Sequence, residues 1–178
     1  MELSISTVVI IVLAMSMLIF GMILLKDIFK GASGAIDNVN KGVINEIDDL
    51  FADKGAKLAI APSTRKISIE QGKGNKGFAF SVRNINNDER TFTFTVEVDN
   101  NFGIQTKCKI SGREANEWVL IPSGSFTLGP GEKHQLPELI TFEIPIDAPI
   151  CTIPYKISIG GAGESYVNTN VELTIEPM

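Results

Sequence analysis

The chain has 178 residues, a formal net charge of −5 and a sequence pI of about 4.9, so it offers no strongly basic face for nucleic acid. Two cysteines and one histidine are too few for a Cys/His zinc site within one chain. The sequence contains no Walker-type or dinucleotide-binding glycine loop. We therefore expect no cofactor, no metal and no enzymatic activity.

The first predicted element is an apolar helix. Residues 3–25 contain no ionisable side chain, and about 20 apolar residues are enough to span a bilayer. Lys26 and Lys30 follow this stretch, whereas only Glu2 precedes it, so the positive-inside rule would place the rest of the chain in the cytoplasm. We predict that a basic leader before Met1 has been removed, and that its charges held the N-terminus inside.

The second predicted element is an amphipathic continuation of this helix over residues 26–54. Apolar residues recur there at spacings of three and four, which draws one stripe on a helix. The stripe consists of Phe29, Ala32, Ile36, Val39, Val43, Ile47 and Leu50. Gly55 is a plausible C-terminal stop. The sequence thus predicts an N-terminal helical part over residues 1–56, with an apolar section 3–25 and an amphipathic section 26–54.

Residues 57–178 form the predicted head domain. The stretch "RTFTFTVEV" alternates apolar and polar residues, which is the signature of a half-buried strand. We also predict strands at "KLAIA", "RKISIE", "GFAFSVRN", "TKCKIS", "EWVLI", "SFTL", "LITFEI", "YKISI" and "VNTNVELTIE". Turn-forming stretches separate them, and Trp118 is predicted to be a core residue. The predicted fold class is α+β: a long N-terminal hydrophobic helix followed by an antiparallel Ig-like β-sandwich.

Few side chains in the head suggest chemistry. Cys108 and Cys151 form either a disulfide, which is the simpler reading for an exported domain, or two separate buried thiols. His134 lies in a predicted turn with no serine or cysteine arranged around it, which indicates a surface histidine. The stretches 86–89 and 99–101 carry Asn and Asp but lack the spacing of a known calcium loop.

The N-terminal sequence "LSISTVVIIVLAMSMLIFGMILL", followed by an amphipathic helix and a β-rich head, resembles the mature N-terminus of archaeal type IV pilin-like proteins, the superfamily that includes archaellins. The likeness covers about the first 30 residues. It implies a prepilin-type peptidase that removes the leader, and a secretion ATPase that drives subunits from the membrane into a filament. Bacterial type IV pilins carry a glutamate inside the apolar stretch, and this sequence does not.

The leading hypothesis is a structural subunit of an extracellular helical filament that binds other copies of itself. Large apolar side chains can exchange lipid for neighbouring helices at little hydrophobic cost. The predicted polymer core consists of Leu3, Ile5, Val8, Val9, Ile10, Ile11, Val12, Leu13, Met17, Leu18, Phe20, Leu24 and Leu25. The alternative is a single-pass, membrane-anchored surface protein whose Ig-like domain binds a cell-wall layer or a partner. Both place the protein at the cell surface, embedded in the membrane before any assembly.

Overall fold

The computed structural model describes residues 14–17, 42–52, 55–161 and 163–178. The chain divides into two compact units, residues 1–42 and 43–178. Within the first unit, residues 14–17 are helical. The second unit holds both hydrophobic clusters of the described chain and its disulfide. A unit of this length buries enough surface to fold independently.

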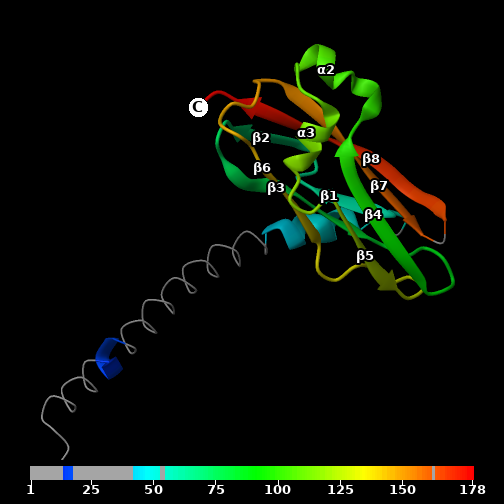
Figure 1. Cartoon of the computed structure of the whole chain (residues 1–178). Helices are drawn as coiled ribbons and strands as arrows, with labels where there is room; N and C mark the ends of the chain where they lie inside the picture. The colour runs from blue at the N-terminus through cyan, green and yellow to red at the C-terminus, as the bar shows by residue number, and fades with distance from the viewer. Residues whose placement is uncertain (1–13, 18–41, 53–54, 162) are drawn as a thin grey trace, which may run out of the picture. The chain divides into compact units, whose positions relative to one another are not determined.

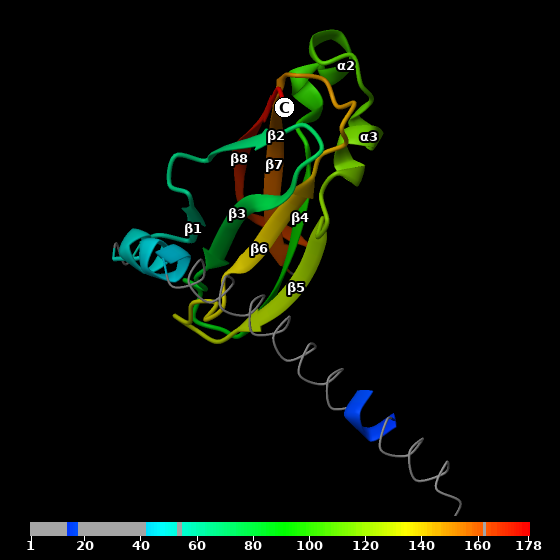
Figure 2. The same cartoon turned by 90° about the vertical axis from the view of Figure 1, so that its left-hand side faces the viewer.

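The second unit is a sandwich of two β-sheets (Figure 1, Figure 2). The three-stranded sheet has the order β1-β3-β6 and contains β1 (Leu58–Ala61), β3 (Gly74–Val82) and β6 (Glu138–Glu143). The five-stranded sheet has the order β2-β8-β7-β4-β5 and contains β2 (Lys66–Glu70), β4 (Arg90–Val98), β5 (Ser123–Leu128), β7 (Thr152–Gly161) and β8 (Glu164–Glu176). Neighbouring strands are antiparallel except β2 and β8, which are parallel.

The core lies between the two sheets and follows from the alternation of the strands. In β4, Phe92, Phe94 and Val96 are buried, while the threonines between them face solvent. Phe80 of β3 meets Phe94 edge to face across the sandwich, with ring centroids 5.1 Å apart. Each fully buried side chain of this size contributes about 1.5–3 kcal/mol of hydrophobic stabilisation. Trp118 is 4% exposed and packs in the same cluster, as the sequence predicts.

Residues 42–50 form a helix that packs on the outer face of the three-stranded sheet. Its residue Ile47 and the following Phe51 are buried, whereas Leu50, another member of the predicted stripe, is 37% exposed. Ile47 and Phe51 pack against three small side chains of the sheet, which let the helix approach closely: Ala59, Ala61 and Ala79. The polar side of the helix is attached too, because Glu46 accepts a hydrogen bond from the Ser63 amide at 2.8 Å.

Two predicted strands do not form in the structure, and short helices overlap part of each stretch. The stretch "TKCKIS" contains the end of α2 (Ile104–Lys107), and α3 (Gly112–Glu117) leads into "EWVLI". A short 3-10 helix, η1 (Asn100–Phe102), precedes them. The Ser111 hydroxyl accepts a hydrogen bond from the Glu114 amide at 3.1 Å, which caps the start of α3. Local capping thus outweighs strand propensity here, and α2 and α3 lie at the end of the sandwich where the chain also ends (Figure 1).

The predicted α+β fold class is wrong. The described chain is mainly β, its helices are short, and its sheets are not wholly antiparallel. Among the described residues, none of the helices has the length and apolar character that a membrane span requires. Of the predicted polymer core, Met17 lies in a helical stretch and is 76% exposed; the other twelve residues lie outside the described ones. Most of the predicted amphipathic section, up to residue 41, lies outside them as well.

Candidate functional site

An open groove of about 520 Å³ lies near α3. Three segments that are distant in sequence line it: the turn between β2 and β3, the end of α3, and the chain that follows β6. Backbone hydrogen bonds hold these segments together. The Ile144 amide donates to the Lys73 carbonyl at 3.0 Å, and the Glu143 amide donates to the Trp118 carbonyl at 2.9 Å. The groove is therefore a preformed feature of the sandwich end.

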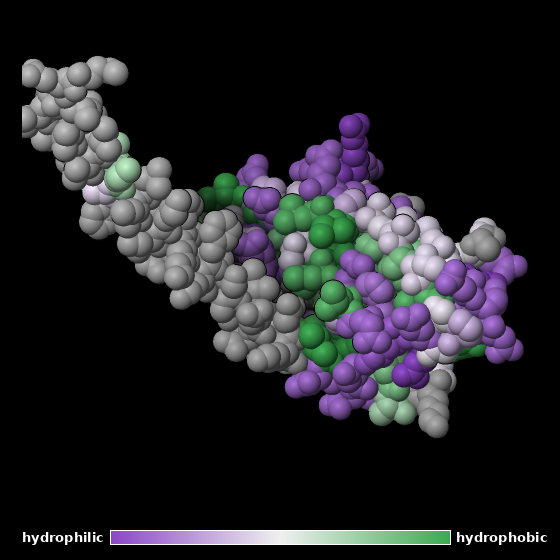
Figure 3. Space-filling model, turned by 90° about the horizontal axis from the view of Figure 1, so that it is seen from below, coloured by the Kyte–Doolittle hydropathy of each residue, from purple (hydrophilic) through white to green (hydrophobic). Residues whose placement is uncertain are grey.

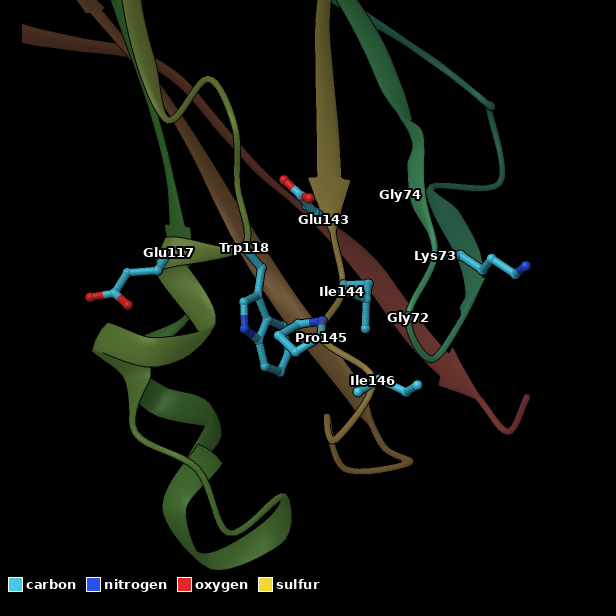
Figure 4. A pocket seen from close by; sticks show the side chains of 9 residues that line it. All are labelled: Gly72, Lys73, Gly74, Glu117, Trp118, Glu143, Ile144, Pro145 and Ile146. Atoms are coloured by element: carbon cyan, nitrogen blue, oxygen red, sulfur yellow. The ribbon is translucent and has the colours of Figure 1, made fainter.

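The groove has an apolar centre and a charged rim. Figure 4 shows Trp118 beside Pro145 and Ile144, while Lys73 and Glu117 extend outward on opposite sides. Glu117 also forms an ion pair with Arg113, with a nitrogen–oxygen distance of 3.5 Å, and both side chains are largely exposed. Exposed pairs of this kind contribute about 0–1 kcal/mol.

The groove is lined by apolar residues and by charged residues of both signs. Its described lining residues are Gly72, Lys73, Gly74, Glu117, Trp118, Glu143, Ile144, Pro145 and Ile146. This set offers apolar surface, two carboxylates and one ammonium group, and it contains no serine, cysteine or histidine. Two isoleucine side chains of this loop are exposed: Ile146 to 65% and Ile150 to 61%. Such a surface suits the apolar side chains of a protein or peptide partner.

The outer face of the five-stranded sheet is polar and nearly uncharged over β4 and β5. It carries a lattice of hydroxyl and amide side chains: Thr91, Thr93, Thr95, Ser123, Ser125, Thr127, Ser158, Asn168 and Asn170. Some of these side chains form hydrogen bonds between neighbouring strands: the Thr91 and Thr127 hydroxyl oxygens lie 2.9 Å apart. Each hydroxyl can both donate and accept a hydrogen bond, so the face suits a polar, uncharged partner.

Apolar side chains gather on another part of the surface. Figure 3 shows a group of hydrophobic residues bordered by hydrophilic ones on the face seen from below. On the outer side of the three-stranded sheet, Leu139 is 46% exposed. Leu120 is 49% exposed, and its amide donates to the Thr141 carbonyl of β6 at 3.0 Å. Contiguous exposed apolar surface marks contact sites in soluble domains.

Cys108 and Cys151 are joined in a disulfide, with their Cα atoms 5.8 Å apart and a sequence separation of 43. The bond connects the end of α2 to the start of β7 and so ties the helical segment to the sheet. Disulfides of this kind form and persist in oxidising compartments. The sandwich therefore belongs to a protein that lies outside the cytoplasm.

His134 is more enclosed than a surface histidine. Its side chain is 21% exposed and stacks on Phe126, with ring centroids 4.3 Å apart. Its Nε2 atom lies 3.9 Å from a carboxylate oxygen of Glu138, and its buried Nδ1 has no hydrogen-bond partner in the described structure. The His134 ring stacks on the Phe126 ring, so His134 contributes to packing.

The carboxylate of Asp99, in one of the acidic and amide turns, is held by hydrogen bonds within the chain. Asp99 uses one oxygen to cap η1 through the Asn101 amide at 3.0 Å, and the other accepts from Asn170 at 3.2 Å. Among the described residues, no three or more His, Cys, Asp or Glu side chains lie close enough together to hold a metal ion.

Sequence reasoning missed a buried polar anchor at the other end of the sandwich. Asn84 is fully buried, and its amide nitrogen donates to the carbonyls of Asp88, Leu128 and Gly129 at 2.8–3.1 Å. Its side-chain oxygen accepts from the Asn86 amide at 3.0 Å. The one sequence signal for this role is the run of asparagines in "RNINNDE". This signal is weak, because Asn is common in turns of every kind.

Comparisons with known proteins give no family. No family model matches the sequence, and no curated protein matches it. Among solved structures, a family 123 glycoside hydrolase from Clostridium perfringens is similar with a TM-score of 0.42 at 12% identity, over 64% of this chain and 23% of that chain. The CsuC-CsuE chaperone–tip adhesion subunit complex of Acinetobacter baumannii gives a TM-score of 0.35 at 16% identity, over 68% of this chain and 57% of that chain.

The PapD-like domain 7 of human CEP192 gives a TM-score of 0.37 at 13% identity, over 70% of this chain and 87% of that chain. Likenesses of this size transfer no activity to the present chain. The expected membership of the archaeal pilin-like superfamily is wrong: no family model matches the sequence, and the similar solved structures include chaperones and PapD-like domains. The apolar pattern of the first 30 residues was too general to identify a family.

Proposed function

We propose that the chain is a structural subunit of an extracellular assembly, in which its sandwich is the solvent-facing part. The observation that carries the proposal is the combination of a 23-residue stretch without ionisable side chains, residues 3–25, with a disulfide-bonded sandwich. Such a stretch is unstable in water, and contacts with other copies are one way to cover it. The disulfide supports a site outside the cell.

The surface of the sandwich supports contact with macromolecules over catalysis. Its groove combines Trp118 and the exposed Ile146 with a charged rim, and a second apolar surface lies around Leu120 and Leu139. Contacts that repeat between copies without closing into a ring produce a filament.

The test is electron microscopy of material sheared from the cell surface, combined with the variant Ile11→Asp. An ionised side chain within the apolar stretch should prevent assembly, because burying an unpaired charge costs several kcal/mol. The matched control is Asn168→Asp, which adds the same charge at an exposed position of β8. Filaments that contain the chain, and that are lost only with Ile11→Asp, support the proposal. Normal filaments from Ile11→Asp would contradict it.

A second candidate is a surface protein that binds a polar layer at the cell envelope. The hydroxyl-rich outer face of the five-stranded sheet favours it, because polysaccharides present matching donors and acceptors. Retention of the chain in washed envelopes, with no filaments, supports this candidate over the first. Loss of that retention in a Thr93→Glu variant would locate the contact on this face.

A further inference from the structure

The edges of the two sheets differ in how they are protected. Exposed edge strands carry unpaired N–H and C=O groups that can pair with another chain, and most proteins block them. On the free side of β2, the Lys76 ammonium donates to the Ser68 carbonyl at 3.5 Å. The edge of β6 is partly paired with the chain around Val119. The remaining edge of the three-stranded sheet, β1, has only four residues.

The fourth edge, β5, has none of these protections. Its sequence, "SGSFTL", contains no charge and no proline. Just before the strand, the Val96 amide donates to the Pro122 carbonyl at 2.7 Å, so the even-numbered residues of β5 bond to β4. The backbone groups of Ser123, Ser125 and Thr127 therefore point away from β4. Within the described part of the chain, these N–H and C=O groups form no backbone hydrogen bond with another segment.

We propose that β5 is the contact site for a second copy of this chain, which pairs through its own β5 in antiparallel orientation across a two-fold axis at Ser125. A two-fold contact requires a surface that complements itself. With Ser125 opposite Ser125 of the partner, Ser123 faces Thr127 of the partner, and these pairs exchange about six backbone hydrogen bonds. The two five-stranded sheets then become one continuous sheet.

The side chains of β5 suit this register. On the outer face, serine lies opposite serine or threonine, and such hydroxyl pairs are favourable across strands. On the inner face, Gly124 lies opposite Phe126 of the partner. Gly124 has no side chain because a Cβ there would lie 2.6 Å from the Phe94 ring. Phe126 is only partly buried within one copy, so its ring can cover the glycine of the other.

The contact is small, since it involves one strand from each copy. Interfaces below about 1,200 Å² are typical of weak association. The dimer is therefore to be sought at protein concentrations up to roughly 1 mM, where associations weaker than micromolar are populated.

The experiment is sedimentation velocity on residues 43–178, which contain the complete sandwich. Because this fragment lacks residues 3–25, its result is independent of the proposed function. The wild-type fragment should show a concentration-dependent dimer. Ser125→Lys places two ammonium groups opposite each other and should weaken the dimer at least about tenfold. The matched control is Thr93→Lys, which adds the same charge to the same face one strand inward and should leave the dimer unchanged.

A second variant tests the direction of the backbone. Ser125→Pro removes an N–H that points to solvent in the monomer, so the fragment should keep its thermal unfolding midpoint within a few degrees and lose the dimer. Ser125→Cys should give a disulfide-linked dimer under mild oxidation, because facing Cα atoms lie about 5.5 Å apart in such a pair. Thr93→Cys should not. A fragment that stays monomeric up to roughly 1 mM, or a dimer that survives both Ser125→Lys and Ser125→Pro, overturns the proposal.

Discussion

Loss of the Cys108–Cys151 disulfide should strongly destabilise the sandwich. The bond closes a span of 43 residues that contains α3, β5 and β6. In the chain-entropy description, closing a span of this length reduces the entropy of the unfolded chain enough to stabilise the fold by about 4 kcal/mol at 25 °C. For a domain of this size, that loss corresponds to a fall in Tm of roughly 10–15 °C.

The assay is equilibrium urea unfolding of residues 43–178, comparing the oxidised fragment with the Cys108→Ala/Cys151→Ala double variant. The reduced wild-type fragment is the control. It keeps both sulfur atoms, so its difference from the double variant measures the cavity left at buried Cys108. A loss of less than about 1 kcal/mol in the reduced fragment would refute the reasoning, since it would mean that the unfolded chain gains little freedom when the bond is opened.

Two further substitutions test buried polar groups by urea unfolding. Asn84→Ala should cost about 2–4 kcal/mol, because several backbone groups lose their buried partner, whereas Asn168→Ala on the exposed face of β8 should cost less than about 0.5 kcal/mol; equal losses would contradict the anchor role. Tyr155→Phe should cost about 1–3 kcal/mol by removing the 2.7 Å hydrogen bond to the Ala115 carbonyl. Burial raises the pKa of Tyr155 above its ordinary value near 10, so its contribution is complete below pH 10 and declines as the pH rises further. The variant should lack this alkaline loss of stability, and an unchanged pH profile would count against it.

The strands of the sandwich could be predicted because their pattern is local. "RTFTFTVEV" alternates over its whole length, and the structure buries the residues that the alternation assigns to the core. The helices α2 and α3 could not be predicted in the same way. They are short, and they depend on the Ser111 cap and on the disulfide, neither of which changes the hydrophobic period.

The candidate binding surfaces could not be predicted from the sequence, for a different reason. The groove joins Gly72, Trp118 and Ile146, which lie in three separate segments, so only the register of the sheets brings them together. The exposed edge of β5 depends on strand order, which a set of predicted strands does not contain. The apolar pattern of residues 3–25 indicates side chains that must be buried away from water. It gave the wrong family, because many unrelated proteins share such a pattern.

The parallel pairing of β2 with β8 has a mechanical consequence. Lys66 lies opposite Glu172 and Glu70 opposite Glu176, so the two strands run side by side in the same direction. A pulling force applied before Lys66 and after Glu176 would shear β2 against β8 along the direction of the strands. Every bond of the ladder then shares the load at once instead of opening in turn, which is a favourable arrangement for a domain exposed to drag.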